Sequence, residues 1–283
     1  VIGAAVAAAF SRIPLKPLRK IAEAADRLAA GDFSARINLK MGGELQELNT
    51  SFNNMANELE QSQMLRSDFI NNFSHEFKTP ITSIRGFAKM IREHNLSREE
   101  TDEYLDIIIA ESDRLVDLSA NVLNLSKVEN QTILTNTAEF NLSEQMRRVI
   151  VLLENRWEEK NLFINLNCSE VYINGNEEML KQVWINLIDN AIKFADKDSE
   201  INITILQGAK FVSVTVSDRG EVIAPEVLGR IFDKFYQGDT SHGVKGNGLG
   251  LAVAAKIVDL HKGSISVTRS DEEQTAFEVR LRR

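Results

Sequence analysis

The sequence predicts a multidomain protein in which an all-α part, including an antiparallel helical hairpin, precedes an α/β sandwich. Two patterns support this fold class. Up to about residue 130, apolar residues recur at heptad spacing, which is typical of helices that pack as a bundle. From Phe140 onward, short apolar strands alternate with amphipathic helices, which indicates a sheet covered by helices.

Length and composition limit the number of domains, the kinds of partner and the redox compartment. With 283 residues, of which 43% are apolar, the chain is long enough for about two domains with cores of their own. The net charge of −8, without a long basic run, argues against a nucleic-acid partner. The only cysteine, Cys168, excludes an internal disulfide and fits a reducing compartment.

The first ten residues are apolar and rich in alanine, and basic residues follow them closely: Arg12, Lys16, Arg19 and Lys20. This run is too short to cross a bilayer, which takes about 20 residues, and a signal peptide would carry its charges before the apolar run. We interpret residues 1–13 as the end of a transmembrane helix whose beginning lies outside this sequence, with the basic residues on the cytoplasmic side. A short buried helix is the alternative.

Two helices with an extended connector follow. The first is predicted over 18–30 and ends at Gly31, a residue typical of helix C-caps. After an extended stretch over 33–41, the second starts near Glu44 and carries a heptad stripe: Leu45, Leu48, Phe52, Met55 and Leu59.

This arrangement resembles a HAMP domain, on the strength of Pro17, Glu44 and the run Phe52-Asn53-Asn54-Met55. Gly43 and Gln46 depart from the acidic residue and the glycine that are usual around that glutamate. The resemblance implies that residues 14–63 form a HAMP linker domain just inside a membrane.

A further helix is predicted around Phe73-Ser74-His75-Glu76-Phe77-Lys78-Thr79-Pro80. Its apolar residues fall seven apart and form a bundle seam: Ile70, Phe77, Ile84 and Ile91. His75 lies opposite the seam and is expected to face water, with Thr79 one turn further along. An exposed histidine alone is more often a surface residue than a catalytic one, and the other three are interpreted so: His94, His242 and His261.

The stripe shifts phase between Leu59 and Ile70, where the spacing is seven plus four, and such a stutter relaxes a supercoil locally. We expect this junction to pass rotation or displacement to the His75 helix. Ser97 and Glu100 then predict a capping box at the start of the next amphipathic helix. Two such helices cannot bury their apolar faces alone, so a homodimeric four-helix bundle is expected.

Beyond residue 137 the pattern predicts helices over 142–157, 177–194 and 249–261, and strands over 162–167, 201–206, 211–217, 264–268 and 276–281. The antiparallel strand pairs favour a sandwich with helices on one face.

Asn186, Asn190 and Lys193 share one face of the helix over 177–194. Asparagines at this spacing are usually part of a solvated stripe, but apolar residues flank these two, so they are expected to edge a pocket. Amide oxygens suit a hard cation such as Mg²⁺, and a lysine suits phosphate.

Asp218 and Gly220 follow directly after the strand over 211–217. A carboxylate there can accept a hydrogen bond from an exocyclic amine such as that of adenine, and glycine lets the backbone approach. The pattern is weak by itself, because Asp-x-Gly is also an ordinary turn.

Aromatic residues over 231–236, including Phe235, anchor a polar segment over 237–245 that we interpret as a lid. A glycine-rich run then opens directly into a helix, whose free amides favour phosphate: Gly246, Gly248, Leu249 and Gly250. A Rossmann site would need a strand before the glycines, and none is predicted there.

Together these motifs resemble those of a sensor histidine kinase. The H-box holds His75, the N-box holds Asn186 and Asn190, and the G1, F and G2 boxes follow in the family's order and spacing, so that the resemblance covers residues 17–283. It implies a dimerisation and phosphotransfer domain over 64–130 and a catalytic ATP-binding domain of the GHKL (Bergerat) fold over 137–283.

The resemblance also implies roles. His75 would attack the γ-phosphate of ATP, with Glu76 accepting or orienting its other ring proton, and the phosphoryl group would pass to an aspartate of a response-regulator receiver domain. Asn186 and Asn190 would hold Mg²⁺ and the phosphates, with Lys193 beside them. Asp218 would bind adenine and Gly220 would shape its pocket. The glycines Gly246, Gly248 and Gly250 would close on the phosphates, and Phe235 and Leu249 would complete the nucleotide site. The implied location is a bacterial inner membrane, with the residues after about 13 in the cytoplasm.

Three points stay open. The His-Glu-x-x-Thr arrangement implies that Thr79 aligns water to dephosphorylate the regulator, although Thr79 alternatively only precedes a helix-kinking Pro80. Val222 stands where the family normally has glycine, which would reduce nucleotide affinity. A degenerate nucleotide-binding scaffold or phosphatase-only sensor is therefore the main alternative, whereas the histidine-bearing hairpin disfavours another GHKL ATPase, such as a chaperone or mismatch-repair protein.

Overall fold

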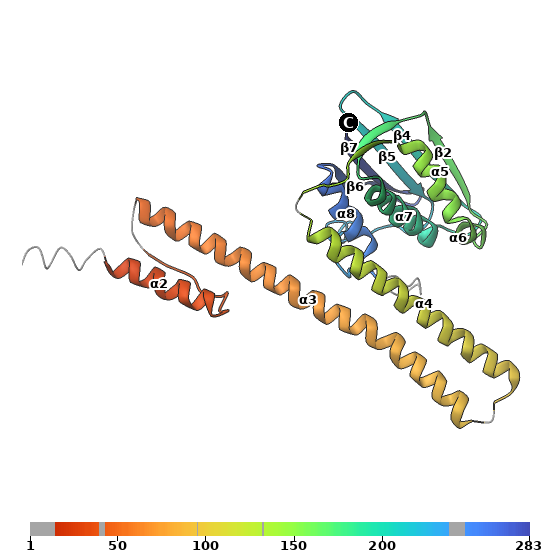
Figure 1. The fold of residues 1–283 in the computed structure, drawn as a ribbon, viewed down its shortest axis with the longest axis horizontal. Coiled ribbons are helices and arrows are strands. Elements are labelled where there is room, and N and C mark those ends of the chain that lie inside the picture. Colours follow the sequence, from red (N-terminus) through yellow and green to blue (C-terminus); the bar gives the residue numbers. More distant parts are fainter. Residues whose placement is uncertain (1–14, 40–42, 95, 132, 238–246) are drawn as a thin grey trace, which may run out of the picture. The chain divides into compact units, whose positions relative to one another are not determined.

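The computed structural model describes residues 15–39, 43–94, 96–131, 133–237 and 247–283. The chain divides into two compact units, Val1–Ser74 and His75–Arg283 (Figure 1). The predicted membrane segment over 1–13 and most of the predicted lid lie outside the described residues. Within the described ranges, none of the helices combines the length and apolar content that crossing a bilayer requires.

In the first unit, α2 (Leu15–Ala29) and the beginning of α3 (Glu44–Glu93) pack on the connector between them. Their small core consists of Ala24, Leu28, Ile37, Leu39, Phe52 and Ala56, with Ile21 and Phe33 partly buried against it. The side-chain amide of Asn53 donates to the carbonyl oxygen of Ile37 and accepts from its N–H, both at 2.8 Å, and so fixes the connector. The predicted helix–connector–helix arrangement is confirmed, although α2 begins earlier than expected because Pro17 fits its first turn.

α3 is one uninterrupted helix of 50 residues. The sequence separates a helix that starts near Glu44 from the His75 helix at the phase shift, and this division is wrong. The helix also continues through Pro80, which is buried. Any signal passed along this stretch therefore travels within a continuous helix.

α4 (Arg98–Glu129) returns beside the second half of α3 as an antiparallel hairpin (Figure 1). The predicted capping box is confirmed: Ser97 Oγ accepts from the N–H of Glu100 at 3.1 Å, and the Glu100 carboxylate accepts from the N–H of Ser97 at 2.8 Å. The rings of Phe87 and Tyr104 pack across the hairpin, with centroids 5.1 Å apart.

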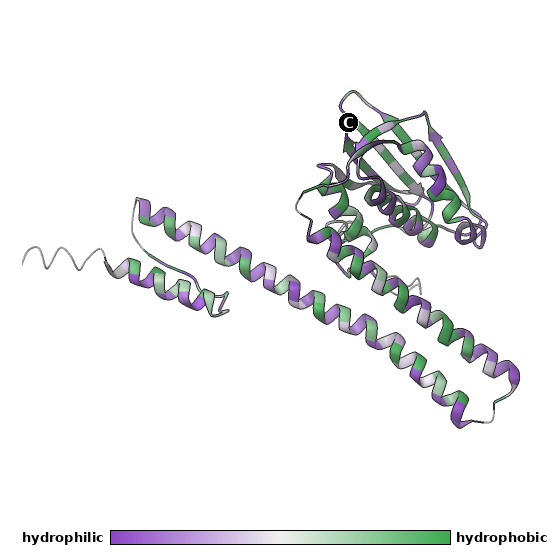
Figure 2. Ribbon diagram, in the orientation of Figure 1, coloured by the Kyte–Doolittle hydropathy of each residue, from purple (hydrophilic) through white to green (hydrophobic). Residues whose placement is uncertain are grey.

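Figure 2 shows apolar residues along both hairpin helices. Several of these residues remain exposed. On α4, Val116 exposes 67% of its surface and Leu123 exposes 62%. Ile81 on α3 and Ile109 on α4 are exposed to a similar degree. A single chain thus leaves an apolar face uncovered, as expected for half of a larger bundle.

The α/β part contains a five-stranded sheet in the order β2-β4-β5-β7-β6. Its strands are β2 (Phe163–Cys168), β4 (Glu200–Gln207), β5 (Phe211–Asp218), β6 (Ser264–Ser270) and β7 (Thr275–Arg282). The pairing of β2 with β4 is parallel, which the prediction of antiparallel pairs missed, and the other pairs are antiparallel. A second, two-stranded sheet of β1 (Ala138–Asn141) and β3 (Tyr172–Gly175) was not predicted.

Helices α5 (Leu142–Leu152), α7 (Glu177–Phe194) and α8 (Gly250–Leu260) cover one face of the large sheet (Figure 1). On β4 the residues facing them are buried, whereas Glu200 and Asn202 on the other face are exposed. The predicted helix over 142–157 is broken at Leu153, after which α6 (Glu154–Glu158) forms a separate turn.

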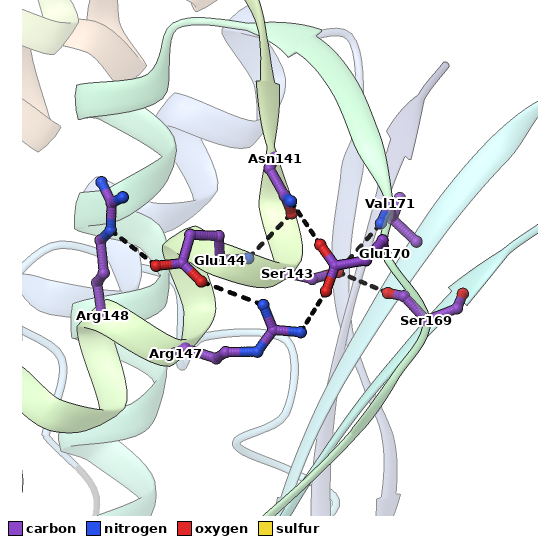
Figure 3. A network of polar contacts seen from close by, with 8 residues as sticks. All are labelled: Asn141, Ser143, Glu144, Arg147, Arg148, Ser169, Glu170 and Val171. Atoms are coloured by element: carbon purple, nitrogen blue, oxygen red, sulfur yellow. Dashed lines mark hydrogen bonds and ion pairs between the residues drawn. The ribbon is translucent and has the colours of Figure 1, made fainter.

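The start of α5 is held by a polar network to the loop before β3 (Figure 3). Asn141 caps α5 by accepting from the N–H of Glu144 at 3.0 Å, and Ser143 Oγ donates to the carbonyl oxygen of Ser169 at 2.7 Å. Arg147 forms ion pairs with both Glu144 and Glu170. This network joins the small sheet to α5 and is a structural feature rather than a site.

Candidate active site

Asp218, the last residue of β5, is the most unusual polar group of the α/β part. It is only 4% exposed, and its Oδ2 is buried without a hydrogen-bond partner among the described residues. Burial raises its pKa to about 7, with a further increase from the nearby Asp196 and an opposing effect of Lys160. A buried acceptor of this kind is costly unless a ligand satisfies it.

Gly220 lies against the C-terminal end of α7. A Cβ at this position would come within 2.0 Å of the carbonyl oxygen of Phe194, so no other residue fits this backbone. Val222, the departure from the family pattern, is 44% exposed and has no left-handed φ, so it does not disturb the contact of Gly220. The expected loss of backbone freedom at Val222 therefore leaves Asp218 and Gly220 in place.

α7 brings Asn186, Asn190 and Lys193 to one partly buried face, as predicted. Asn186 Nδ2 donates to the carbonyl oxygen of Gly250 at 2.9 Å, and its Oδ1 accepts from Gln182 at 3.1 Å. Burial lowers the pKa of Lys193, whose ammonium lies 5.3 Å from the ring centroid of Phe194. The N-box helix is thus joined directly to the start of α8.

Phe235 and Gly248 join the F and G2 segments. The N–H of Phe235 donates to the carbonyl oxygen of Gly248 at 2.9 Å, and both residues have positive φ. A Cβ on Gly248 would lie 2.6 Å from the backbone of Phe235, so glycine is required. Leu249 is fully buried and anchors the turn into α8, which starts without a side-chain cap, while Gly246 lies outside the described residues.

The H-box side chains are placed as the heptad pattern predicts. His75 and Thr79 are exposed, and Thr79 Oγ1 donates to the backbone carbonyl of His75 at 3.3 Å. Glu76 is partly buried, with one carboxylate oxygen 3.0 Å from Arg114 of α4 and the other 3.4 Å from Gln237. Arg114 and Gln237 were not predicted as site residues, because their contact with Glu76 joins distant parts of the chain.

The interpretation of His261 as a surface residue is wrong. His261 is partly buried rather than a surface residue: its Nε2 accepts from the N–H of Asn176 at 3.0 Å, and its Nδ1 lies 2.8 Å from the carbonyl oxygen of Ile257. Burial lowers its pKa, which fits a neutral imidazole that donates from Nδ1. His261 thus joins the end of α8 to the N-cap of α7, whereas His94 is exposed as expected.

These residues fit a purine nucleotide with its metal. In the part of the chain that the structure describes, Oδ2 of Asp218 is an acceptor without a partner, and Gly220 and Gly248 lie where a side chain is forbidden. The uncapped amides of α8 favour an anion. The amide oxygens of Asn186 and Asn190 are suitable ligands for Mg²⁺.

Three family models match the chain, and together they span most of it. Residues 10–61 match the HAMP domain, residues 65–131 the His Kinase A (phospho-acceptor) domain, and residues 175–283 the histidine kinase-, DNA gyrase B- and HSP90-like ATPase. The chain belongs to the sensor histidine kinases of two-component systems.

Among individual proteins, the chain is similar to the heme sensor protein HssS of several staphylococci. The protein from Staphylococcus epidermidis is 33% identical over 282 residues, which cover 99% of this chain and 60% of the relative. The protein from Staphylococcus haemolyticus is 32% identical over 267 residues, with 94% and 58% covered. The chain therefore spans about three fifths of the length of these relatives.

Solved histidine kinases share the fold. The Acinetobacter baumannii histidine kinase AdeS has a TM-score of 0.59 and 25% identity, covering 74% of this chain and 97% of that one. The histidine kinase ThkA, solved in complex with the response regulator protein TrrA, has a TM-score of 0.66 and 26% identity, covering 79% of this chain and 63% of that one.

Proposed function

We propose that this chain is the signalling part of a sensor histidine kinase that phosphorylates its own His75 from ATP and passes the phosphoryl group to an aspartate of a response regulator. The buried carboxylate of Asp218 carries the proposal, because its Oδ2 has no hydrogen-bond partner among the described residues and could accept from an amine such as that of adenine. The exposed His75 on the hairpin supplies an accessible nucleophile.

The residues divide the chemistry between them. A ring nitrogen of His75 forms a bond to the γ-phosphorus while the bond from that phosphorus to the ADP oxygen breaks. Glu76 accepts or orients the other ring proton, and Arg114 holds its carboxylate in place. Asn186 and Asn190 would hold Mg²⁺, which neutralises phosphate charge when bound. The amides at the start of α8 and the ammonium of Lys193 would hold the phosphates of ATP.

The other proposals concern assembly and location. The exposed apolar face of the hairpin supports a homodimeric four-helix bundle over residues 64–130. We place the HAMP linker at 14–63, the catalytic domain at 137–283, and a membrane attachment through residues 1–13. A response-regulator receiver domain is the proposed protein partner, as ThkA is found with its regulator.

Incubation with γ-labelled ATP and Mg²⁺ tests the kinase. We expect acid-labile, base-stable label on the native chain and none on His75→Gln, whereas Asp218→Asn should lower ATP affinity roughly tenfold by removing a charged acceptor. Lys210→Met, at an exposed position outside the hollow beside Asp218, serves as the control for Asp218→Asn. No label on a native chain that still binds ATP would favour a scaffold or phosphatase-only sensor instead.

We further propose that the protein dephosphorylates its regulator with the help of Thr79. This hydroxyl is exposed one helical turn from His75, so it can orient a water near the same surface. Thr79→Ala should reduce the loss of phosphate from a phosphorylated regulator by about tenfold or more while autophosphorylation persists. Thr79→Ser, which retains the hydroxyl, is the matched control, and equal dephosphorylation by Thr79→Ala and native protein would contradict the role.

A further inference from the structure

Lys160, which lies just after α6, is placed against the C-terminal end of α7. Its ammonium donates to three backbone carbonyl oxygens there: Ile192 at 2.9 Å, Lys193 at 2.7 Å and Ala195 at 3.2 Å. Carbonyls at a helix C-terminus lack partners within the helix and carry its negative end, so a cation is favourable at this position. All three donors of the ammonium are thereby used.

The same helix end forms the surroundings of Asp218. The N–H of Asp196 donates to the carbonyl oxygen of Arg219 at 2.8 Å, which joins the turn after α7 to the segment after β5. The N–H of Asp198 donates to the carbonyl oxygen of Lys160 at 3.1 Å, so Lys160 is fixed to this turn through its backbone as well. Its charge is therefore held at a defined place beside the carboxylate.

The charged groups around Asp218 act in opposite directions. Burial and the carboxylate of Asp196 raise its pKa, whereas the ammonium of Lys160 lowers it. A hollow of about 500 Å³ beside Asp218 is lined by further charged residues: Asp196, Lys197, Asp198, Glu200, Arg219 and Glu273. Among all of these, Lys160 is the cation that three carbonyl contacts immobilise.

We propose that Lys160 is a positioning residue for base choice: its immobilised ammonium favours the ionised form of Asp218, and this form accepts adenine and rejects guanine. This inference rests on the proposed function and deepens it.

The choice between adenine and guanine follows from the hydrogen-bonding roles of the ionised and the protonated carboxyl group of Asp218. An ionised carboxylate only accepts, so it matches the exocyclic amine of adenine and repels the carbonyl oxygen that guanine carries at the corresponding position. A protonated carboxyl group also donates, and it can therefore bind that oxygen. Loss of the Lys160 charge increases the protonated fraction near neutral pH, where Asp218 titrates, and relaxes the discrimination.

The test is equilibrium binding of ADP and of GDP, with Mg²⁺, to the whole chain between about pH 6 and about pH 9, which brackets the Asp218 pKa of about 7. The preference of the native protein for ADP should rise with pH as Asp218 loses its proton. In Lys160→Met the rise should shift to higher pH, and the preference at about pH 7.5 should fall roughly tenfold. Lys160→Gln retains donors for the carbonyls without the charge and should behave in the same way.

Two further variants isolate the role. Lys160→Arg retains the cation and should keep the native midpoint, and Lys210→Met removes an exposed cation outside the hollow and should also leave the midpoint unchanged. If Lys160→Met and Lys160→Gln keep the native ADP preference and midpoint, even with lower stability, Lys160 is only a helix cap and the inference is wrong. If the native chain binds neither nucleotide, it is the proposed function that fails.

Discussion

At Gly220 a single hydrogen in place of a side chain allows β5 to end against α7. The carbonyl oxygen of Phe194 occupies the space that a Cβ would need, and Asp218 lies two residues before this contact. The backbone geometry at Gly220 therefore decides where the buried carboxylate of Asp218 is held. Gly229, by contrast, has open space where a Cβ would lie.

We predict that Gly220→Ala weakens ADP binding by at least tenfold and lowers the free energy of unfolding by about 2–4 kcal/mol, since either β5 or the end of α7 must move. Calorimetric titration and urea unfolding measure the two effects. Gly229→Ala is the matched control and should change neither. Native affinity in Gly220→Ala would show that the contact with Phe194 does not position the site.

α7 is the element on which the site depends, and contacts from distant parts of the chain hold it along its length. His261 contacts its N-cap residue Asn176, Gln145 accepts from the indole N–H of Trp184 at 2.7 Å, and Lys160 contacts its C-terminus. The side chains of Asn186 and Asn190 are therefore presented from a helix that is fixed at both ends. This rigidity suits ligands that a metal and phosphates require in defined positions.

The His261 contact predicts a dependence of stability on pH. Because burial lowers the pKa of His261 below the ordinary 6.5, the unfolded chain binds this proton more readily than the folded chain. The contribution of His261 to the stability of the fold is fully present above about pH 6.5 and is lost as the pH falls toward the lowered pKa. Urea unfolding near pH 7.5 and near pH 5.5 measures how much free energy of unfolding is lost on acidification. This loss should be smaller for His261→Asn than for the native chain.

Asp218 has the opposite effect on the pH dependence of the free energy of unfolding. The effect of His261 is therefore measured as the difference between the native chain and His261→Asn. The raised pKa of Asp218 stabilises the fold below the unfolded value of 3.8, and this contribution is lost as the pH rises to about 7. Because both proteins contain Asp218, its contribution is the same in each and cancels when their free energies of unfolding are subtracted. Substitution of the exposed His94 by Gln should leave the native pH dependence intact, and an equal effect of both substitutions would contradict the account of His261.

At the scale of the whole molecule, the hairpin of one chain is incomplete. Ile109, Val116 and Leu123 fall seven residues apart on α4, as in the apolar stripe of a packed helix, and yet all three are exposed. A second copy would bury this face and bring two His75 side chains into one assembly. Dimerisation is thus expected to be a condition for a stable phosphoacceptor domain.

We predict that Val116→Asp dissociates the dimer, because each copy would bury an unpaired carboxylate in the bundle. Sedimentation equilibrium should show an increase in the dissociation constant of roughly a hundredfold or more. Val151→Asp makes the same change at a valine of similar exposure on α5, 65% against 67%, and should leave the dimer intact. Equal dissociation by both, or by neither, would contradict the predicted interface.

Local patterns in the sequence predicted much of this molecule. The bounds of α7 follow from strong periodicity after Asn176, and those motif residues that the structure describes lie on the elements expected for them. The break at Leu153 was missed because neither glycine nor proline marks it, and the parallel pairing of β2 with β4 depends on packing rather than on either strand. The contacts of Lys160 and His261 join residues 32 to 85 positions apart, which no local pattern encodes.

The most direct measurement is the identification of the phosphorylated residue by mass spectrometry at neutral to basic pH, after incubation of the chain with ATP and Mg²⁺. We expect phosphate on His75 in the native chain, and roughly tenfold less of it when Asp218 is replaced by Asn at an ATP concentration well below saturation. Phosphate on another residue, or an unmodified His75 in a chain that demonstrably binds ATP, would contradict this expectation.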